Sequence, residues 1–216
     1  MGRNFPAAEI LKTGQGGYMD AAGILALISM VIFYVLFIGR TVLLYKKGVR
    51  VWVIGVSAKR PLEIILENIL FPVLALWTIY VLLIIFHVEL PYILSKSIFS
   101  IPALRYAGIL LCYAGLIIFF MALLSFGKAW RIGIDEKNSN ELITGGIFRY
   151  SRNPIFLFMD MYFTGMMLVY PTVILILTAL GAAAGLHLQI LREEKFLLEK
   201  FGEKYAEYKK HTRRYL

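Results

Sequence analysis

The chain has 216 residues, of which 59% are hydrophobic and 17% are charged, and its formal net charge at pH 7 is +9. Soluble globular domains are about half apolar and about a quarter charged, so this composition excludes a soluble enzyme and a disordered chain. The single cysteine, Cys112, excludes a small secreted domain built on disulfides.

Three long uncharged runs predict membrane-spanning helices. They cover residues 21–38, 68–86 and 106–126, which are 18, 19 and 21 residues. A helix needs about 20 residues to cross a bilayer. We therefore predict helices over about 21–45, 61–86 and 103–126, with an outer loop between the last two.

The chain is apolar again from residue 155 to residue 191, apart from an interruption at Tyr170-Pro171. This pattern predicts a helical hairpin of 155–170 and 172–191. The tail 192–216 places Leu198, Phe201, Tyr205 and Tyr208 on one helical stripe, which predicts an amphipathic helix continuous with the fifth span. The sequence thus predicts an all-α integral membrane protein with five transmembrane helices, a cytoplasmic C-terminal helix and a single domain.

The placement of the basic residues predicts the orientation. Nineteen of the 23 lysines and arginines lie in segments 39–60, 127–154 and 192–216, which alternate with the apolar runs. Basic excess in short loops marks the cytoplasmic side, where it also meets anionic membrane lipids. We expect a plasma-membrane protein with its N-terminus outside and its C-terminus in the cytoplasm. Nucleic acid is not an expected partner, because no basic module stands clear of the membrane.

A candidate anion site lies in segment 145–154, at the start of the fourth predicted helix. Asn153 is a favoured N-cap and Pro154 a favoured first helical residue. The N–H groups of this helix end, together with Arg149 and Arg152, would suit a carboxylate or a phosphate. A helix N-cap next to two arginines that are simply part of the basic cytoplasmic side explains the same residues equally well.

Carboxylates near the other helix ends are the next candidates. Glu194 shares a stripe with Phe201, so it needs a cationic partner on the packed face. Taken alone, it favours an ion pair with Arg149, Arg152 or a tail lysine over a ligand site. Asp160 and His187 lie in predicted spans and are interpreted as structural hydrogen-bonding residues. No cluster of His, Cys, Asp or Glu predicts a metal site.

Segment 145–156, with residues 192–194, Phe201-Gly202, Tyr205, Tyr208 and 213–214 downstream, resembles the C-terminal half of the isoprenylcysteine carboxyl methyltransferase family. Related phospholipid N-methyltransferases share this pattern. The resemblance departs from the family's Arg-His-Pro-x-Tyr-x-Gly pattern at Asn153, Phe156 and Phe158. It divides the chain into an N-terminal three-helix part, 1–126, and a cofactor-binding part, 127–216.

The resemblance implies a membrane methyltransferase that uses S-adenosylmethionine and a lipophilic or membrane-resident acceptor. Arg152 and Glu194 would be the catalytic residues, with an arginine holding the methionyl carboxylate and Glu194 or Glu193 the amino group or the ribose. The implied cofactor-binding set is Arg149, Tyr150, Arg152, Asn153, Pro154, Phe156, Glu193, Glu194, Tyr205 and Tyr208. The alternatives are an NADPH-dependent membrane reductase of the sterol reductase type and a non-catalytic membrane scaffold.

Overall fold

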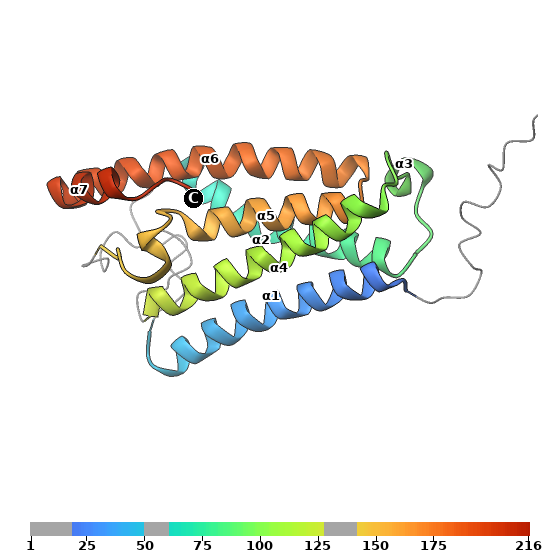
Figure 1. Cartoon of the computed structure of the whole chain (residues 1–216), viewed down its shortest axis with the longest axis horizontal. Helices are drawn as coiled ribbons and strands as arrows, with labels where there is room; N and C mark the ends of the chain where they lie inside the picture. Colours follow the sequence, from blue (N-terminus) through green and yellow to red (C-terminus); the bar gives the residue numbers. More distant parts are fainter. Residues whose placement is uncertain (1–18, 50–60, 128–141) are drawn as a thin grey trace, which may run out of the picture.

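A computed structural model describes residues 19–49, 61–127 and 142–216, with side chains described from residue 72 onward in the second range. The predicted cytoplasmic stretches 50–60 and 128–141 lie outside the described residues. Within the described part, all long elements are helices packed side by side along one direction (Figure 1). The all-α prediction is therefore confirmed for these residues.

In the part of the chain that the structure describes, five long helices form the bundle, and their bounds follow the apolar runs closely. They are α1 (Ala21–Lys46), α2 (Pro61–Ile85), α4 (Pro102–Phe126), α5 (Pro154–Val169) and α6 (Val173–Phe201). The three helices α1, α4 and α6 are long and apolar enough to cross a membrane, whereas Pro72–Ile85 and α5 are shorter apolar segments. The predicted outer loop also contains a short helix, α3 (Tyr92–Ser95).

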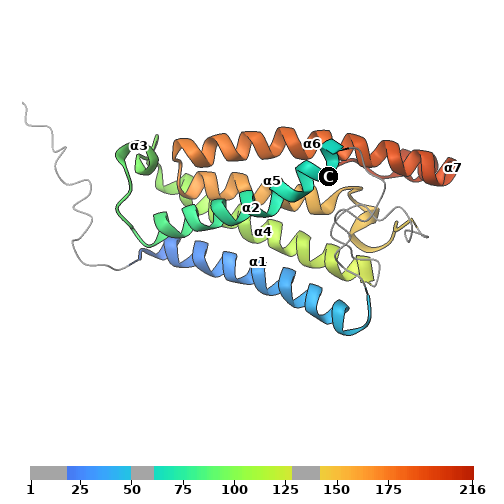
Figure 2. The ribbon, with the colours of Figure 1, turned by 180° about the vertical axis from the view of Figure 1, so that it is seen from behind.

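The core is formed chiefly by α1, α2, α4 and α5, with α2 packed beside α5 (Figure 2). The helices α4 and α5 approach closely because glycines face each other there. A Cβ atom added at Gly108 would lie 2.5 Å from the carbonyl oxygen of Gly165, and one at Gly165 would lie 2.5 Å from the sulfur of Cys112. Small residues that let helix backbones approach are the usual basis of packing in membranes.

Phe158 stands where the family pattern has glycine, and it belongs to this core. Its ring stacks on Phe119 with centroids 4.6 Å apart and lies 5.6 Å from the ring of Phe33. The side chain is 3% exposed. The departure from glycine therefore fills space between α5, α4 and α1 with an aromatic contact.

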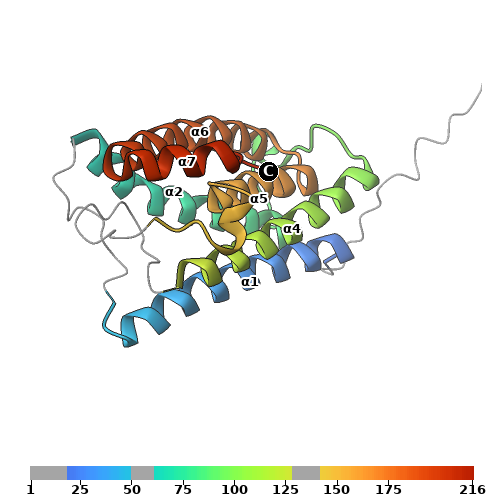
Figure 3. The ribbon, with the colours of Figure 1, turned by 60° about the vertical axis from the view of Figure 1, so that its left-hand side comes forward.

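The tail differs from the predicted continuous helix. The helix α6 ends at Phe201, Gly202 takes a positive φ of 52°, and α7 (Glu203–His211) runs back along the end of α6 (Figure 3). The predicted stripe is also wrong in part, because Leu198 is 44% exposed while Tyr205 is 1% exposed. The reason is that the turn at Gly202 changes the helix direction, so Tyr205 is buried by folding back and not by lying on the α6 stripe.

Candidate functional site

Arg152 and Glu194 form a buried ion pair at the end of the bundle where α5 begins. Arg152 lies two residues before α5 and Glu194 lies in the last two turns of α6. The Nη2 atom of Arg152 donates to Oε1 of Glu194 at 2.9 Å, and the two side chains are 7% and 6% exposed. Arg152 also donates to the carbonyl oxygens of Lys209 and Thr212 at 2.9 and 3.1 Å.

The last residues of the chain supply a second arginine to the same carboxylate. Arg214 donates from Nε and Nη2 to the two oxygens of Glu194 at 3.0 and 2.9 Å. Its hydrogen bond with Glu194 raises the pKa of the Arg214 guanidinium above its ordinary value, against a smaller effect of burial. The ammonium of Lys209 lies 3.9 Å from the carboxylate. We refer to Arg152, Glu194 and Arg214 as the arginine–glutamate cluster.

Backbone and polar contacts fasten the chain end against the start of α5. The amide of Arg152 donates to the carbonyl oxygen of Arg213 at 2.9 Å, and Ser151 pairs with Arg213 in an isolated bridge. Asn153 occupies the N-cap position, but its side chain donates to the carbonyl oxygen of Arg214 at 3.1 Å and makes no cap bond. The expected capping role is corrected to that extent, because the returning chain end offers the amide a carbonyl partner.

Two tyrosines of α7 border the cluster. Tyr205 is 1% exposed, and its hydroxyl has no hydrogen-bond partner among the described residues. Burial, together with the nearby Glu194 carboxylate, raises the pKa of the Tyr205 phenol to about 12. Tyr208 donates to the carbonyl oxygen of Phe148 at 2.6 Å, which joins α7 to the short 3₁₀ helix η2 (Gly146–Arg149).

The other residues of the cofactor-binding set that the family resemblance implies lie at the edge of the cluster or away from it. Arg149 and Tyr150 are exposed, and Phe156 is half-buried. Pro154 is fully buried at the start of α5. The carboxylate of Glu193, one residue before Glu194, accepts a hydrogen bond from Gln189 at 3.3 Å. The structure thus brings together Arg152, Asn153, Glu194 and the α7 tyrosines.

Arg214 belongs to the arginine–glutamate cluster, and the candidate site predicted from the sequence does not include it. The sequence signal for it was the Arg213-Arg214 pair in the family pattern. That pair lies 20 residues after Glu194, and no helical periodicity connects the two because the chain turns back between them.

A second group of polar side chains lies deeper along α5 and α6. His187 Nδ1 and the Tyr215 hydroxyl are 2.8 Å apart, and their rings stack with centroids 6.3 Å apart. Asp160 on α5 interacts electrostatically with both. Its Oδ1 atom is buried and accepts no hydrogen bond from the part of the chain that the structure describes.

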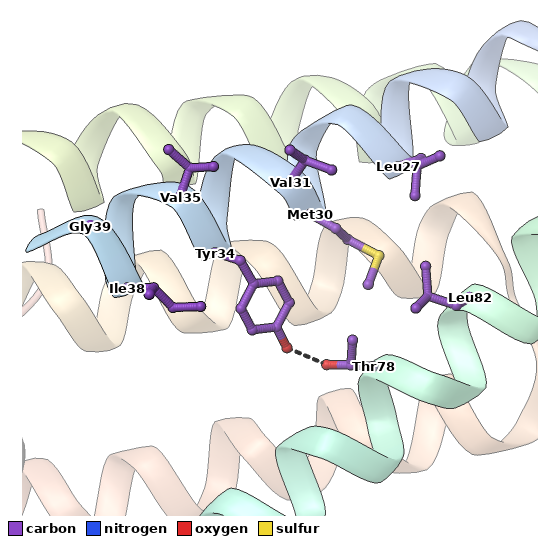
Figure 4. A pocket seen from close by; sticks show the side chains of 9 residues that line it. All are labelled: Leu27, Met30, Val31, Tyr34, Val35, Ile38, Gly39, Thr78 and Leu82. Atoms are coloured by element: carbon purple, nitrogen blue, oxygen red, sulfur yellow. Dashed lines mark hydrogen bonds between the residues drawn. The ribbon is translucent and has the colours of Figure 1, made fainter. Parts of the chain in front are cut away.

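An apolar groove runs between α1 and α2, and it is chemically unlike the cluster. It has a volume of about 520 Å³ and is lined by Leu27, Met30, Val31, Tyr34, Val35, Ile38, Gly39, Thr78 and Leu82 (Figure 4). The only polar side chains in it, Tyr34 and Thr78, hydrogen-bond to each other. The groove suits a hydrocarbon chain and offers no charge to a polar cofactor.

No metal site is present within residues 19–49, 72–127 and 142–216, where no three His, Cys, Asp or Glu side chains gather. The arginine–glutamate cluster and the α7 tyrosines offer guanidinium donors, a carboxylate acceptor and aromatic faces. Such groups can hold a zwitterionic ligand, because the guanidinium binds its carboxylate and the glutamate its amino group.

Comparison with known proteins identifies the region that carries this site. A sequence search against curated proteins gives no match. Residues 104–204 match the phospholipid methyltransferase family, to which isoprenylcysteine carboxyl methyltransferases belong. This stretch runs from α4 to the start of α7 and contains both Arg152 and Glu194. The chain is therefore similar to the phospholipid methyltransferase family over residues 104–204.

Proposed function

We propose that the protein is an S-adenosylmethionine-dependent methyltransferase acting on a lipophilic or membrane-resident acceptor. The observation that carries the proposal is the family match over residues 104–204, which include Arg152 and Glu194 of the buried arginine–glutamate cluster. The apolar bundle around this cluster supports a lipophilic acceptor, since such a molecule can approach from the bilayer.

The cluster has the chemistry that this cofactor requires. Two buried polar atoms there, Nε of Arg152 and the hydroxyl of Tyr205, have no hydrogen-bond partner among the described residues. Buried polar atoms usually find partners, so these atoms are the natural contacts of a bound polar molecule. The residues present therefore fit a ligand that carries both an acid and hydrogen-bonding groups.

In this proposal each residue of the cluster has a defined task. Arg152 holds the methionyl carboxylate beside the first turn of α5, and Glu194 holds the amino group or the ribose hydroxyls. Arg214 and the chain end close the cluster toward the cytoplasmic side, and Tyr205 supplies an aromatic face. When bound, the cofactor supplies an activated methyl group on a sulfonium. The protein's task is then to position the donor against the acceptor and to exclude water.

The first test measures cofactor binding. Arg152→Ala should weaken S-adenosylmethionine binding by about 1.5–3 kcal/mol, the usual size of a hydrogen bond to a charged group. Arg152→Lys should recover only part of this loss, because an ammonium cannot reproduce the guanidinium fork. Calorimetry on purified protein in detergent measures the affinity, and Glu203→Gln on the exposed side of α7 is the control. Equal affinity in all variants would refute the assignment of Arg152.

The same preparation distinguishes the alternative activities. Binding of S-adenosylmethionine to the folded protein should raise its melting temperature, and NADPH should not. A shift with NADPH and none with S-adenosylmethionine would favour a reductase. A shift with neither would favour a non-catalytic protein.

We also propose that the cluster faces the cytoplasm. The end of α1, the end of α4 and the start of α5 lie at one end of the bundle, and these are the ends that adjoin the basic segments (Figure 1). Cysteines replacing Lys47 and Lys209 should be shielded from an impermeant thiol reagent in intact cells, and one replacing Lys96 should react. Labelling at Lys47 from outside would overturn this orientation.

A further inference from the structure

The apolar groove between α1 and α2 is a feature that the proposed function does not use. Every residue that lines it lies within 27–39 or 78–82, outside the stretch 104–204 that matches the methyltransferase family. None of these residues belongs to the arginine–glutamate cluster. The volume of about 520 Å³ is within the usual range of ligand pockets. The groove is therefore a separate place for a ligand.

The lining of the groove favours an occupant without polar groups. The hydroxyl of Thr78 donates to the carbonyl oxygen of Leu74 at 2.7 Å, so Tyr34 is the donor in its hydrogen bond with Thr78. Both hydroxyl protons in the groove are then used. The other lining side chains carry no hydrogen-bond donor (Figure 4). A polar molecule would give up its hydrogen bonds to water here and find no free donor, whereas a hydrocarbon chain has none to lose.

The groove has about the length of a lipid chain in one leaflet. Twelve residues of α1 separate Leu27 from Gly39, which is about 18 Å along the helix axis. One leaflet contributes about 15 Å of hydrocarbon, half of the bilayer core. The helices come together at Leu27 and Leu82 and separate toward Gly39 (Figure 4), and Figure 2 shows α2 leading away from α1 toward the same end. The groove therefore opens toward the end of the bundle that adjoins the basic segments.

A cation lies on the groove face of α1, just beyond the open end. Lys46 follows Gly39 by seven residues, nearly two helical turns, so it continues the lined face about 10 Å further along α1. Tyr45 has the same relation to Ile38, and both Tyr45 and Lys46 are exposed. No Asp or Glu lies in segment 39–60. Tyrosine is typical of the membrane interface, and lysine there attracts anionic head groups.

We propose that the α1–α2 groove binds one acyl chain of an anionic glycerophospholipid whose phosphate lies beside Lys46. The lipid is a bound component of the protein and not its methyl acceptor, so this inference does not depend on the proposed function. The apolar walls account for the chain. Lys46 accounts for the head group, since it attracts a lipid with a net negative charge more strongly than one whose phosphate is balanced by choline. Bound in this way, the lipid links α1 to α2 across the groove.

The test measures the binding of two lipids to the purified protein in a neutral detergent. Dioleoyl phosphatidylglycerol and dioleoyl phosphatidylcholine have the same chains and differ in net charge. Native mass spectrometry measures the bound lipid, and the melting temperature reports binding to the folded protein. We expect phosphatidylglycerol to bind about 5-fold more tightly and to raise the melting temperature further, because one lysine near a lipid surface contributes about that factor.

Two variants locate the lipid, each with a matched control. Gly39→Leu adds a side chain at the open end of the groove, where a Cβ atom meets nothing within 4 Å. It should lower the affinity for both lipids by about 10-fold or more, because the added side chain and the acyl chain cannot occupy the same space. Gly181→Leu makes the same change in equally open space on α6 and should have no effect.

Lys46→Gln should lower the affinity for phosphatidylglycerol about 5-fold and leave the affinity for phosphatidylcholine unchanged. The control is Lys47→Gln, at an equally exposed position turned about 100° further around the helix axis, which should leave both affinities unchanged. Equal losses in the two lysine variants would mean attraction to the basic surface as a whole and would overturn the proposal. Equal affinity of the wild type for the two lipids would overturn it as well.

The remaining outcomes concern other occupants. A dimer that Gly39→Leu dissociates would make the occupant a second copy of the chain, and transfer of a labelled methyl group to phosphatidylglycerol would make it an acceptor; either result overturns the proposal. If Gly39→Leu fails to fold, the two lysine variants still decide. Binding of S-adenosylmethionine should be the same in Lys46→Gln and the wild type, so failure of the lipid site leaves the proposed function standing.

Discussion

The strength of the contact between Glu194 and Arg214 can be worked out from the structure and measured. Arg214 makes two hydrogen bonds to the carboxylate, at 3.0 and 2.9 Å, and Glu194 is buried. A hydrogen bond to a charged group contributes about 1.5–3 kcal/mol when buried. The Arg214 side chain is 33% exposed, so solvent screens part of this contribution. We therefore expect a coupling free energy of about 1.5–2.5 kcal/mol between the two side chains.

A double-mutant cycle measures this coupling directly. Glu194→Gln, Arg214→Gln and the double variant are unfolded in mixed micelles, and the free energies of unfolding are compared with that of the wild type. Glu194→Gln alone should be the more costly single change, because it leaves the buried Arg152 guanidinium without its counter-charge. Glu194→Gln should lower the free energy of unfolding only in part, because Arg152 keeps its hydrogen bonds to two carbonyl oxygens.

The control is the exposed pair Glu207 and Lys210. Its nitrogen–oxygen distance of 2.8 Å is as short as those at Glu194, so the two pairs differ mainly in exposure. Both of its side chains are exposed, so no measurable coupling is expected there. A coupling below about 0.5 kcal/mol between Glu194 and Arg214 lies within the range of independent sites. That result would refute the conclusion that the chain end is held in place by this carboxylate.

Two further predictions concern the bundle. Gly165→Ala should destabilise the protein by about 1–3 kcal/mol, because its Cβ atom would overlap Cys112 and the backbone of Gly108. The control is Gly181→Ala, which should be tolerated because nothing lies within 4 Å of the added Cβ atom. Thermal unfolding in detergent compares the two variants. Asp20 pairs with Arg105 at 2.6 Å. Burial raises the pKa of Asp20, but its hydrogen bonds with Arg105 and the Gly23 amide outweigh this and hold the pKa below 3.8. The pair should therefore stabilise the protein above about pH 4 and lose that effect as the pH falls through the lowered pKa, and Asp20→Asn should abolish this pH dependence. Equal acid sensitivity in Asp20→Asn and the wild type would contradict it.

The positions of the long helices could be predicted from the sequence because the bilayer imposes a simple local rule. An uncharged run of about 20 residues must form a helix if it is to cross hydrocarbon, since no water is there to satisfy its backbone. For this reason α1 and α4 begin and end close to the predicted limits. The start of α5 at Pro154 was predictable as well, because proline favours the first turn of a helix.

The sequence predicted part of the candidate site, namely the charged residues that lie at the ends of predicted helices. Arg152 and Glu194 could be selected because one lies at a helix start and the other is a carboxylate at the end of an apolar run. The ion pair between them was one of two readings that the sequence left open, and the structure contains it.

What only the tertiary structure decided is the course of the chain end. The turn at Gly202 reverses the tail, so Arg214 reaches Glu194 and the carbonyl oxygen of Arg214 takes the side chain of Asn153. The same turn exposes Leu198 and buries Tyr205. Helical periodicity describes neighbours within one straight helix, and contacts across a reversal depend on the turn and on packing between elements. The sequence alone therefore determined the spans and the charged residues at their ends, while the fold determined which of those charges meet.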